Sequence, residues 1–204
     1  MTYKHVISFG SLCHMGNILK RNKLKHASYP FDWIFSNLNI IIQCIEDDFK
    51  IFLDKQYYTQ KKNGHSYYYP DGITMFNHHT PLIEKDYQYF VRCVERFRKI
   101  LLLNDEKKLF CMMYNPYLSP SHLTDEMKNE VFENNNKLQK YCQNYTLLCI
   151  IHHTGSNRQY TFTSYENIDF LELTTITKTD GLIFPNKDDE IFLDWVINEK
   201  YKFN

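Results

Sequence analysis

The stretch that decides the fold is Val6-Ile7-Ser8-Phe9-Gly10-Ser11-Leu12-Cys13. Its first four residues form a short β-type run, which the glycine and serine that follow bring to an end. Apolar residues then recur at helical spacing, at Leu12, Met15 and Leu19. The stretch therefore predicts a strand, a tight turn and a helix, with Ser11 as the helix N-cap. Cys13 is then expected in the first helical turn, off the apolar stripe.

Strands and helices alternate along the rest of the chain. Apolar residues at helical spacing predict further helices at 37–53, 84–103, 124–144 and 188–200. Short continuous apolar runs predict strands at 109–114, 145–151 and 168–176. A Pro-Asp-Gly turn at 70–72 predicts an antiparallel hairpin near 67–76. The alternation predicts one α/β domain over residues 1–204, a layered sheet with helices on both faces.

The composition argues against several classes of protein. Because 24 Lys and Arg balance 24 Asp and Glu, we expect no broad electrostatic surface for nucleic acid or an anionic membrane. A hydrophobic content of 43% and an aromatic content of 16% argue against a disordered chain. No apolar run reaches the roughly 18–20 residues that a membrane span requires. The first ten residues lack the apolar stretch of a signal peptide, so we expect a cytoplasmic protein.

The six cysteines divide into two groups. None forms a Cys-x-x-Cys pair, so a zinc ribbon and a thioredoxin-type motif are not expected. Five lie inside apolar periodic segments, where free cysteine behaves as a small buried hydrophobe. These five are Cys44, Cys93, Cys111, Cys142 and Cys149. Cys13 is the exception, because it stands at the predicted start of a helix.

Cys13 and the pair His78-His79 are the first candidates for chemistry. A thiol in the opening turn of a helix lies near unpaired backbone N–H groups and the positive end of the helix dipole, which both stabilise a thiolate. The loops that leave the carboxyl ends of parallel strands form a ligand crevice. A histidine at the end of another strand could meet Cys13 there and act as a base. The alternative is that Cys13 only packs.

Several segments resemble one protein family. They are Val6–Cys13 with the helix after it, Ala27-Ser28-Tyr29-Pro30-Phe31-Asp32-Trp33-Ile34, Gly72-Ile73-Thr74-Met75-Phe76-Asn77-His78-His79, the helix Tyr87–Phe97 and the strand Lys108–Phe110. Together they are similar to the putative papain-like cysteine peptidase family, which is found in bacteria and large DNA viruses. Beyond Phe110 the similarity is only a succession of helices and strands.

The resemblance implies a hydrolase with a Cys–His site. Cys13 would be the nucleophile, and His78 or His79 the base, with His78 preferred. Asp32, the polar residue of the shared Pro-Phe-Asp-Trp motif, would orient the histidine; its alternative role is a carboxylate that caps a helix or lies buried in a turn. The substrate would be a peptide, an isopeptide or another acyl group, and no cofactor is implied.

The name of that family implies a different fold from the one that the residues predict. A papain-like fold packs its nucleophile helix against an antiparallel barrel or sheet. Here a strand leads directly into the helix of Cys13, and later strands of the buried type are separated by helices. No papain-type Cys-Gly-Ser-Cys-Trp stretch surrounds Cys13. The residues therefore favour a layered sheet of the flavodoxin or esterase kind.

Four alternatives to the cysteine hydrolase remain open. The pairs His78-His79 and His152-His153 each follow a predicted strand and could together bind zinc, but no His-Glu-x-x-His motif supports a metal site. Gly10-Ser11 after a strand is similar to the nucleophile turn of esterases that act on acylated sugars, without their Gly-Asp-Ser sequence. A glycan or nucleotide-sugar transferase would show an Asp-x-Asp motif, which is missing. The last alternative is a non-enzymatic binding or accessory module.

Overall fold

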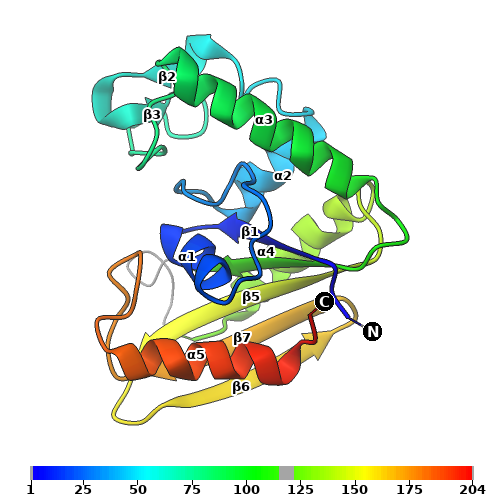
Figure 1. Ribbon diagram of the computed structural model, residues 1–204, viewed down its shortest axis with the longest axis vertical. Coiled ribbons are helices and arrows are strands. Elements are labelled where there is room, and N and C mark those ends of the chain that lie inside the picture. Colours follow the sequence, from blue (N-terminus) through cyan, green and yellow to red (C-terminus); the bar gives the residue numbers. More distant parts are fainter. Residues whose placement is uncertain (1, 115–121, 204) are drawn as a thin grey trace.

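A five-stranded sheet forms the centre of the molecule (Figure 1). The computed structural model describes residues 2–114 and 122–203. The strand order is β1-β4-β5-β7-β6, and all neighbours are parallel except β6, which runs antiparallel to β7. The strands are β1 (His5–Gly10), β4 (Lys108–Met113), β5 (Tyr145–Thr154), β6 (Gln159–Tyr165) and β7 (Ile168–Thr175). The predicted strand regions near 6–9, 109–114, 145–151 and 168–176 are confirmed, whereas β6 was not anticipated.

The sheet is buried on both faces along β1, β4 and β5, because most side chains of these strands are apolar. Successive side chains of a strand point to opposite faces, so the core divides into two clusters. One contains Ile7, Phe9, Phe110, Met112, Leu147, Cys149 and Ile151. The other contains Val6, Leu109, Cys111, Met113, Leu148 and Ile150. This continuous burial is typical of parallel strands covered by helices.

Helices supply the outer layers, as the alternation of strands and helices predicts. Helices α1 (Cys13–Arg21) and α5 (Lys187–Lys200) pack on the face that carries Val6 and Leu109. Helices α2 (Leu38–Glu46), α3 (Glu84–Leu101) and α4 (Asp125–Leu138) contribute to the other cluster. Figure 1 shows α1 and α5 in front of the sheet, with α3 beyond its β1 edge. The mixed α/β architecture with helices on both faces is confirmed.

Polar contacts join α1 to α5 and so fix the position of the helix that carries Cys13. His14, which is fully buried, lies with its Nε2 atom 3.2 Å from the Glu190 carboxylate. Arg21 at the other end of α1 forms two hydrogen bonds to Asp194, of 2.8 and 2.6 Å, and also pairs with Glu190. Both ends of α1 are therefore anchored to α5.

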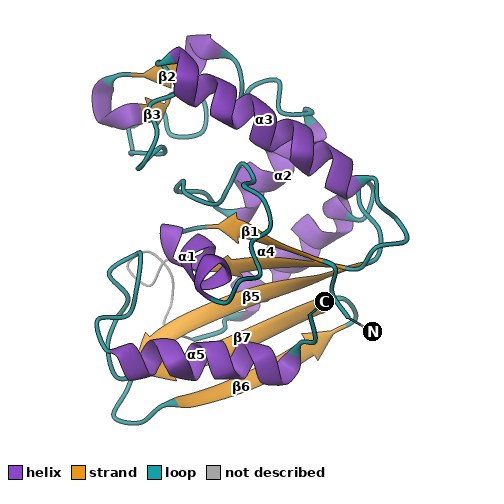
Figure 2. Ribbon diagram, viewed as in Figure 1, coloured by secondary structure: helices purple, strands orange, loops and turns teal. Residues whose placement is uncertain are grey.

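The antiparallel strand pair lies earlier than the predicted hairpin. Its strands are β2 (Tyr58–Thr59) and β3 (Gly64–His65), joined through the 3₁₀ turn Lys61–Asn63 and preceded by the 3₁₀ turn Lys55–Tyr57 (Figure 2). The Pro-Asp-Gly segment does turn, but residues 67–69 do not form a strand. Tyr68 instead packs against the core: its ring centroid lies 4.6 Å from that of His65, and its hydroxyl lies 3.1 Å from the Cys44 sulfur.

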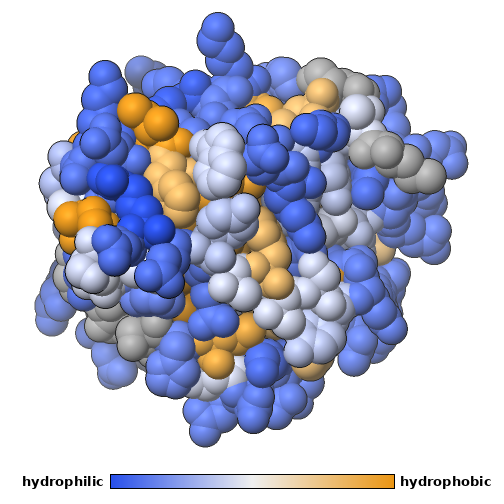
Figure 3. Space-filling view, turned by 90° about the horizontal axis from the view of Figure 1, so that it is seen from below, coloured by the Kyte–Doolittle hydropathy of each residue, from blue (hydrophilic) through white to orange (hydrophobic). Residues whose placement is uncertain are grey.

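The surface is mixed in character. Figure 3 shows that hydrophilic side chains cover most of the face seen from below, with small hydrophobic patches between them. In the described ranges 2–114 and 122–203, no helix has both the length and the apolar character needed to cross a bilayer.

Candidate functional site

The turn between β1 and α1 presents Cys13, and its geometry is unusual. Gly10 and Ser11 both have positive φ, of 71° and 62°, and Leu12 takes the N-cap position with an extended backbone. The prediction that Ser11 caps the helix is wrong, because the left-handed backbone moves Ser11 outside the helix. The main chain replaces the missing side-chain cap: the His14 N–H donates to the Gly181 carbonyl at 2.8 Å. A left-handed serine is uncommon and often marks a functional turn.

The space around residue 10 requires glycine, as does its positive φ. A Cβ atom at this position would lie 2.7 Å from Ser36 Oγ and 2.8 Å from the Phe31 carbonyl oxygen. Ser36 also donates from its hydroxyl to the Phe9 carbonyl at 3.3 Å. The segment 30–36, which begins with the Pro-Phe-Asp-Trp motif, therefore packs directly on the turn that leads to Cys13.

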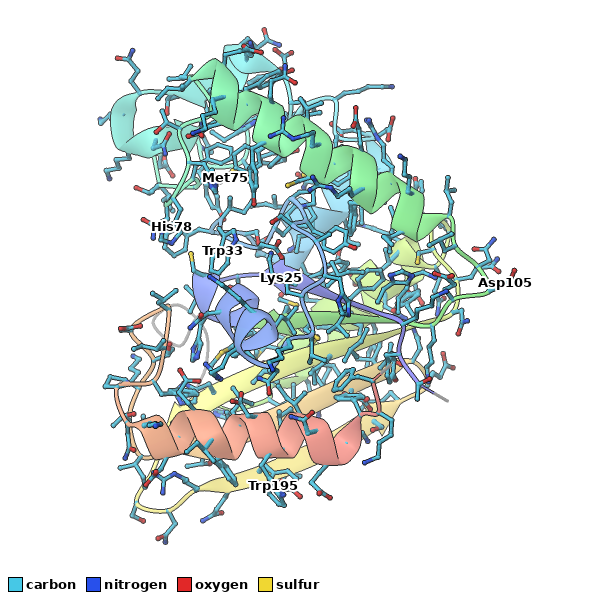
Figure 4. All side chains as sticks on the ribbon, in the orientation of Figure 1. Lys25, Trp33, Met75, His78, Asp105 and Trp195 are labelled. Atoms are coloured by element: carbon cyan, nitrogen blue, oxygen red, sulfur yellow. The ribbon has the colours of Figure 1, made fainter. Side chains whose placement is uncertain are left out.

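Cys13 lines a cavity of about 390 Å³ that four separate parts of the chain enclose. The start of α1 provides Leu12 and Cys13, and the remaining lining residues are Phe35, Asn77, His78, Asp180, Gly181 and Leu182. Of the two histidines that the sequence offers, His78 shares this cavity with Cys13. Figure 4 shows His78 and Trp33 close together near the first turn of α1.

The loop that carries Asn77 and His78 is held at both ends. The Asn63 side-chain amide donates to the carbonyls of Phe76 and His79, which flank the pair. On the C-terminal side, the backbone N–H of Thr80 donates to Asp86 at 2.7 Å. Two exposed residues are thus presented from a loop whose backbone is fixed.

Burial dominates the electrostatics of Cys13. Its residue is only 3% exposed, and this burial raises the pKa of the thiol, while a hydrogen bond from the Asn77 side chain and its own backbone N–H act in the opposite direction. The position at a helix start predicts a stabilised thiolate; here loss of solvation outweighs that effect. Cys13 is therefore a neutral thiol at neutral pH, with a hydrogen-bond donor already beside the sulfur.

His78 and His79 point to different surroundings although they are adjacent. The His78 ring meets Trp33 edge to face, with centroids 6.0 Å apart. The His79 ring stacks on Tyr89 of α3 at 4.2 Å. Burial lowers the pKa of His79, with Asp86 acting against it. Within the described part of the chain, the lining of the Cys13 cavity includes His78 and not His79.

Asp32 does not line the cavity. It is 1% exposed, forms an ion pair with Lys25 and accepts a hydrogen bond from the Tyr29 N–H at 2.7 Å. The Lys25 ammonium lies 5.3 Å from the centre of the Trp33 ring, which in turn contacts His78. Asp32 is therefore connected to His78 through Lys25 and Trp33. These contacts match the alternative of a buried turn carboxylate.

Two polar residues of the cavity were not predicted from the sequence. Asn77 immediately precedes His78, and Asp180 follows β7. The Asp180 carboxylate accepts hydrogen bonds from the backbone N–H groups of Leu182 and Ile183, each at 2.8 Å. The signal for Asp180 was available: an Asp-Gly turn after a strand, at the carboxyl edge where parallel sheets bind ligands.

The second histidine pair, His152 and His153, contacts threonine hydroxyls on β7. His152 contacts the Thr175 hydroxyl at 2.6 Å, and His153 contacts the Thr174 hydroxyl at 2.7 Å, each through Nε2. In residues 2–114 and 122–203, no group of three or more His, Cys, Asp or Glu side chains could together hold a metal ion. The four-histidine zinc alternative therefore has no assembled ligand set among the described residues.

All six cysteines are unpaired and buried. Cys44, Cys93, Cys111, Cys142 and Cys149 are at most 2% exposed, in agreement with the prediction that they are core residues. Cys13 differs from them because it begins a helix and lines a cavity together with a histidine, His78.

Comparison with known proteins gives one match. No curated protein and no solved structure matches the chain significantly. A family model matches residues 4–155, more than half of the chain, so this match includes Cys13 and His78 but ends before β6. The chain belongs to the family described as putative papain-like cysteine peptidases.

Proposed function

We propose that this protein is a cysteine hydrolase in which Cys13 attacks an acyl carbonyl and His78 transfers the proton. The observation that carries the proposal is the shared cavity: Cys13 and His78 come from distant parts of the sequence and line the same 390 Å³ space. Membership of the putative papain-like cysteine peptidase family supports the same chemistry. The substrate class that we propose is a peptide, an isopeptide or another acyl compound.

The reaction has two steps. In the first, a bond forms between Cys13 Sγ and the carbonyl carbon while the thiol proton passes to His78. The bond to the leaving group then breaks, and the leaving group takes that proton, so that a thioester remains. In the second step, His78 removes a proton from water, the water oxygen attacks the thioester, and the sulfur leaves as the thiol. The products are an acid and the protonated leaving group.

The neutral resting state of Cys13 makes the base necessary. Because burial raises the pKa of the thiol, thiolate is scarce at neutral pH, and attack requires proton transfer to a neighbour. A positioned general base contributes about 10²–10⁴-fold to such a reaction. His78 is the histidine of the cavity lining.

Asn77 and Asp32 have supporting roles in the proposed reaction. The Asn77 side chain, already hydrogen-bonded to the Cys13 sulfur, would donate to the negative oxygen of the tetrahedral intermediate. The His14 N–H is engaged by Gly181, so it does not serve this purpose. Asp32 acts as a positioning residue, because its ion pair with Lys25 supports the ring of Trp33 against which His78 packs.

The experiment uses acyl-directed electrophiles that form stable adducts with catalytic cysteines, such as acyloxymethyl ketones and vinyl sulfones of varied side chain. Wild type, Cys13→Ala and Cys142→Ala are compared by intact mass and peptide mapping. We expect one adduct at Cys13, absent from Cys13→Ala and retained in Cys142→Ala, whose residue is 2% exposed and lies outside the lining of the Cys13 cavity. Equal modification of Cys13 and the core cysteines, or no adduct at Cys13, would overturn the proposal and favour a binding module.

A further inference from the structure

A second and larger cavity lies beside the Cys13 cavity. It has a volume of about 750 Å³, which is within the range of small-molecule sites. Phe35 lines both cavities, and Ser11, two residues before Cys13, lines the larger one. Met112 and Tyr114 line it at the end of β4. The cavity therefore occupies the carboxyl edge of β1 and β4, where parallel sheets bind ligands.

Tyr114 is the residue that points to a ligand. Its side chain is about nine-tenths buried, and its hydroxyl has no hydrogen-bond partner in the part of the chain that the structure describes. Burial raises the pKa of this phenol, so it stays neutral and can both donate and accept a hydrogen bond. A buried hydroxyl without a partner is unfavourable, and a hydroxylated ligand in the cavity would remove that penalty.

Glu130 and Asn39 form a second polar feature of the lining. The Asn39 amide donates to one Glu130 carboxylate oxygen at 3.1 Å. An amide and a carboxylate held side by side offer acceptors and donors at neighbouring positions. Neighbouring hydroxyl groups on one ring of a ligand match that pattern. Each hydroxyl can donate a hydrogen bond to the Glu130 carboxylate and accept one from the Asn39 amide.

The remaining lining indicates an uncharged ligand with one apolar face. Among the described residues that line the cavity, the charged side chains are Lys62 and Glu130, which have opposite sign. Such a lining does not select a phosphate or a polycation. Apolar and aromatic side chains complete the wall: Phe35, Tyr69, Ile73 and Met112. The rings of Phe35 and Tyr69 offer flat apolar surfaces, against which the C–H face of a sugar can pack.

We propose that this cavity binds a single neutral pyranose ring of a saccharide, with Tyr114 and the Glu130–Asn39 pair as its hydrogen-bonding partners. The binding of the sugar does not depend on the proposed hydrolase. One further step does rest on it: the bound sugar is the alcohol or amine part of the acyl compound that Cys13 attacks. If both hold, the compound cleaved is an acylated saccharide, and the sugar oxygen or nitrogen leaves with the proton from His78.

The test is saturation-transfer NMR with the methyl glycosides of glucose, galactose, mannose and N-acetylglucosamine at millimolar concentration. The proteins are wild type, Tyr114→Phe, Glu130→Gln, Cys13→Ala and, as a matched control, Tyr160→Phe, whose ring is 40% exposed on β6. We expect at least one glycoside to bind saturably to wild type, Cys13→Ala and Tyr160→Phe. Tyr114→Phe should weaken that binding about threefold to tenfold, and Glu130→Gln at least as much.

The same set of variants also shows whether weaker binding results from unfolding. Tyr114→Phe removes an unpaired buried hydroxyl, so its Tm should equal or exceed that of wild type, and weaker binding cannot then be ascribed to unfolding. The absence of binding across the panel, or binding that neither Tyr114→Phe nor Glu130→Gln weakens, would overturn the saccharide site. Adduct formation at Cys13 with no glycoside bound would overturn this proposal alone. Glycoside binding with no adduct at Cys13 would overturn the hydrolase alone.

Discussion

The two walls of the Cys13 cavity are built differently. One wall is regular: Leu12 and Cys13 begin α1, which follows directly from β1 and packs on the sheet. The other wall is irregular, with Asn77 and His78 on one loop and residues 180–182 on another. The nucleophile therefore takes its position from the sheet, whereas the positions of its polar partners depend on individual side-chain contacts to loops. Variants in each wall test this difference.

The largest effect is expected from the irregular wall at His78. His78→Ala should lower the rate of probe addition to Cys13 at neutral pH by about 10²–10⁴-fold, because the neutral thiol loses its base. His79→Ala is the matched control, since its ring stacks on Tyr89 outside the cavity lining. The rates are measured by mass spectrometry with the probe that labels wild type. Equal losses in the two variants would remove the distinction between the adjacent histidines.

The second effect tests how closely the regular wall is packed. In Gly16→Ala, the new Cβ would lie 2.4 Å from the backbone oxygen of Asp32, so α1 or the 28–33 segment must move. We expect a loss of about 1–3 kcal/mol in the free energy of unfolding, measured by urea denaturation, together with slower labelling of Cys13. Gly155→Ala is the control, because the atom closest to its new Cβ would be the methyl group of Thr174. A Gly16→Ala protein as stable as wild type would contradict this prediction, because the packing between Gly16 and Asp32 could then relax without loss of stability.

The third effect concerns the histidine pair that lies outside the Cys13 cavity lining. Burial lowers the pKa of His152 from 6.5 to about 3, with His14 and His153 adding to the shift. Between these values the unfolded chain binds more protons than the folded one, so stability falls as the pH falls. His152 alone should lower the free energy of unfolding by about 2 kcal/mol at pH 5 relative to pH 7.

The measurement is urea denaturation of wild type and His152→Gln at both pH values. The variant should lose the part of the decrease that His152 causes and keep the part due to His65, whose pKa burial lowers to about 4. If wild type and variant show the same decrease, His152 is not buried in its neutral form, and the account of this pair is wrong.

The smallest effect is expected at the loop that caps α1. Gly181 has φ of +100°, and nothing lies within 4 Å of the position that a Cβ would take, so Gly181→Ala introduces backbone strain without a clash. We expect a loss of about 1 kcal/mol in the free energy of unfolding and slower labelling of Cys13, because the Gly181 carbonyl caps the His14 N–H. Gly72→Ala, with φ of +80° and equal space, should lose similar stability and leave the labelling unchanged.

The sequence predicted the regular half of the site and only part of the irregular half. Periodicity located β1, β4, β5, β7 and the helices, because those segments bury apolar residues in a repeating pattern. It predicted a helix over 37–53, whereas α2 spans Leu38–Glu46. The helix ends there because the backbone has positive φ at Asp48 and Phe49. Periodicity also missed β6, which is the exposed antiparallel edge and has no buried stripe.

The polar residues of the site were harder to predict for a physical reason. Asp32 is bound by Lys25, seven residues earlier, and no local pattern distinguishes that contact from an orienting bond to a histidine. Asn77 and Asp180 reach the cavity through loops whose paths depend on single hydrogen bonds, such as those of Asn63 to the carbonyls on either side of residues 77–78. Chain periodicity contains no information on such contacts.

The most direct test of the central claim is the pH dependence of iodoacetamide addition to Cys13 in wild type and His78→Gln, with the five core cysteines as internal references. If Cys13 and His78 act as a pair, wild type reacts at neutral pH although burial raises the pKa of the thiol. The variant should then react only as the pH rises toward that raised pKa. Superimposable profiles for the two proteins would contradict the account.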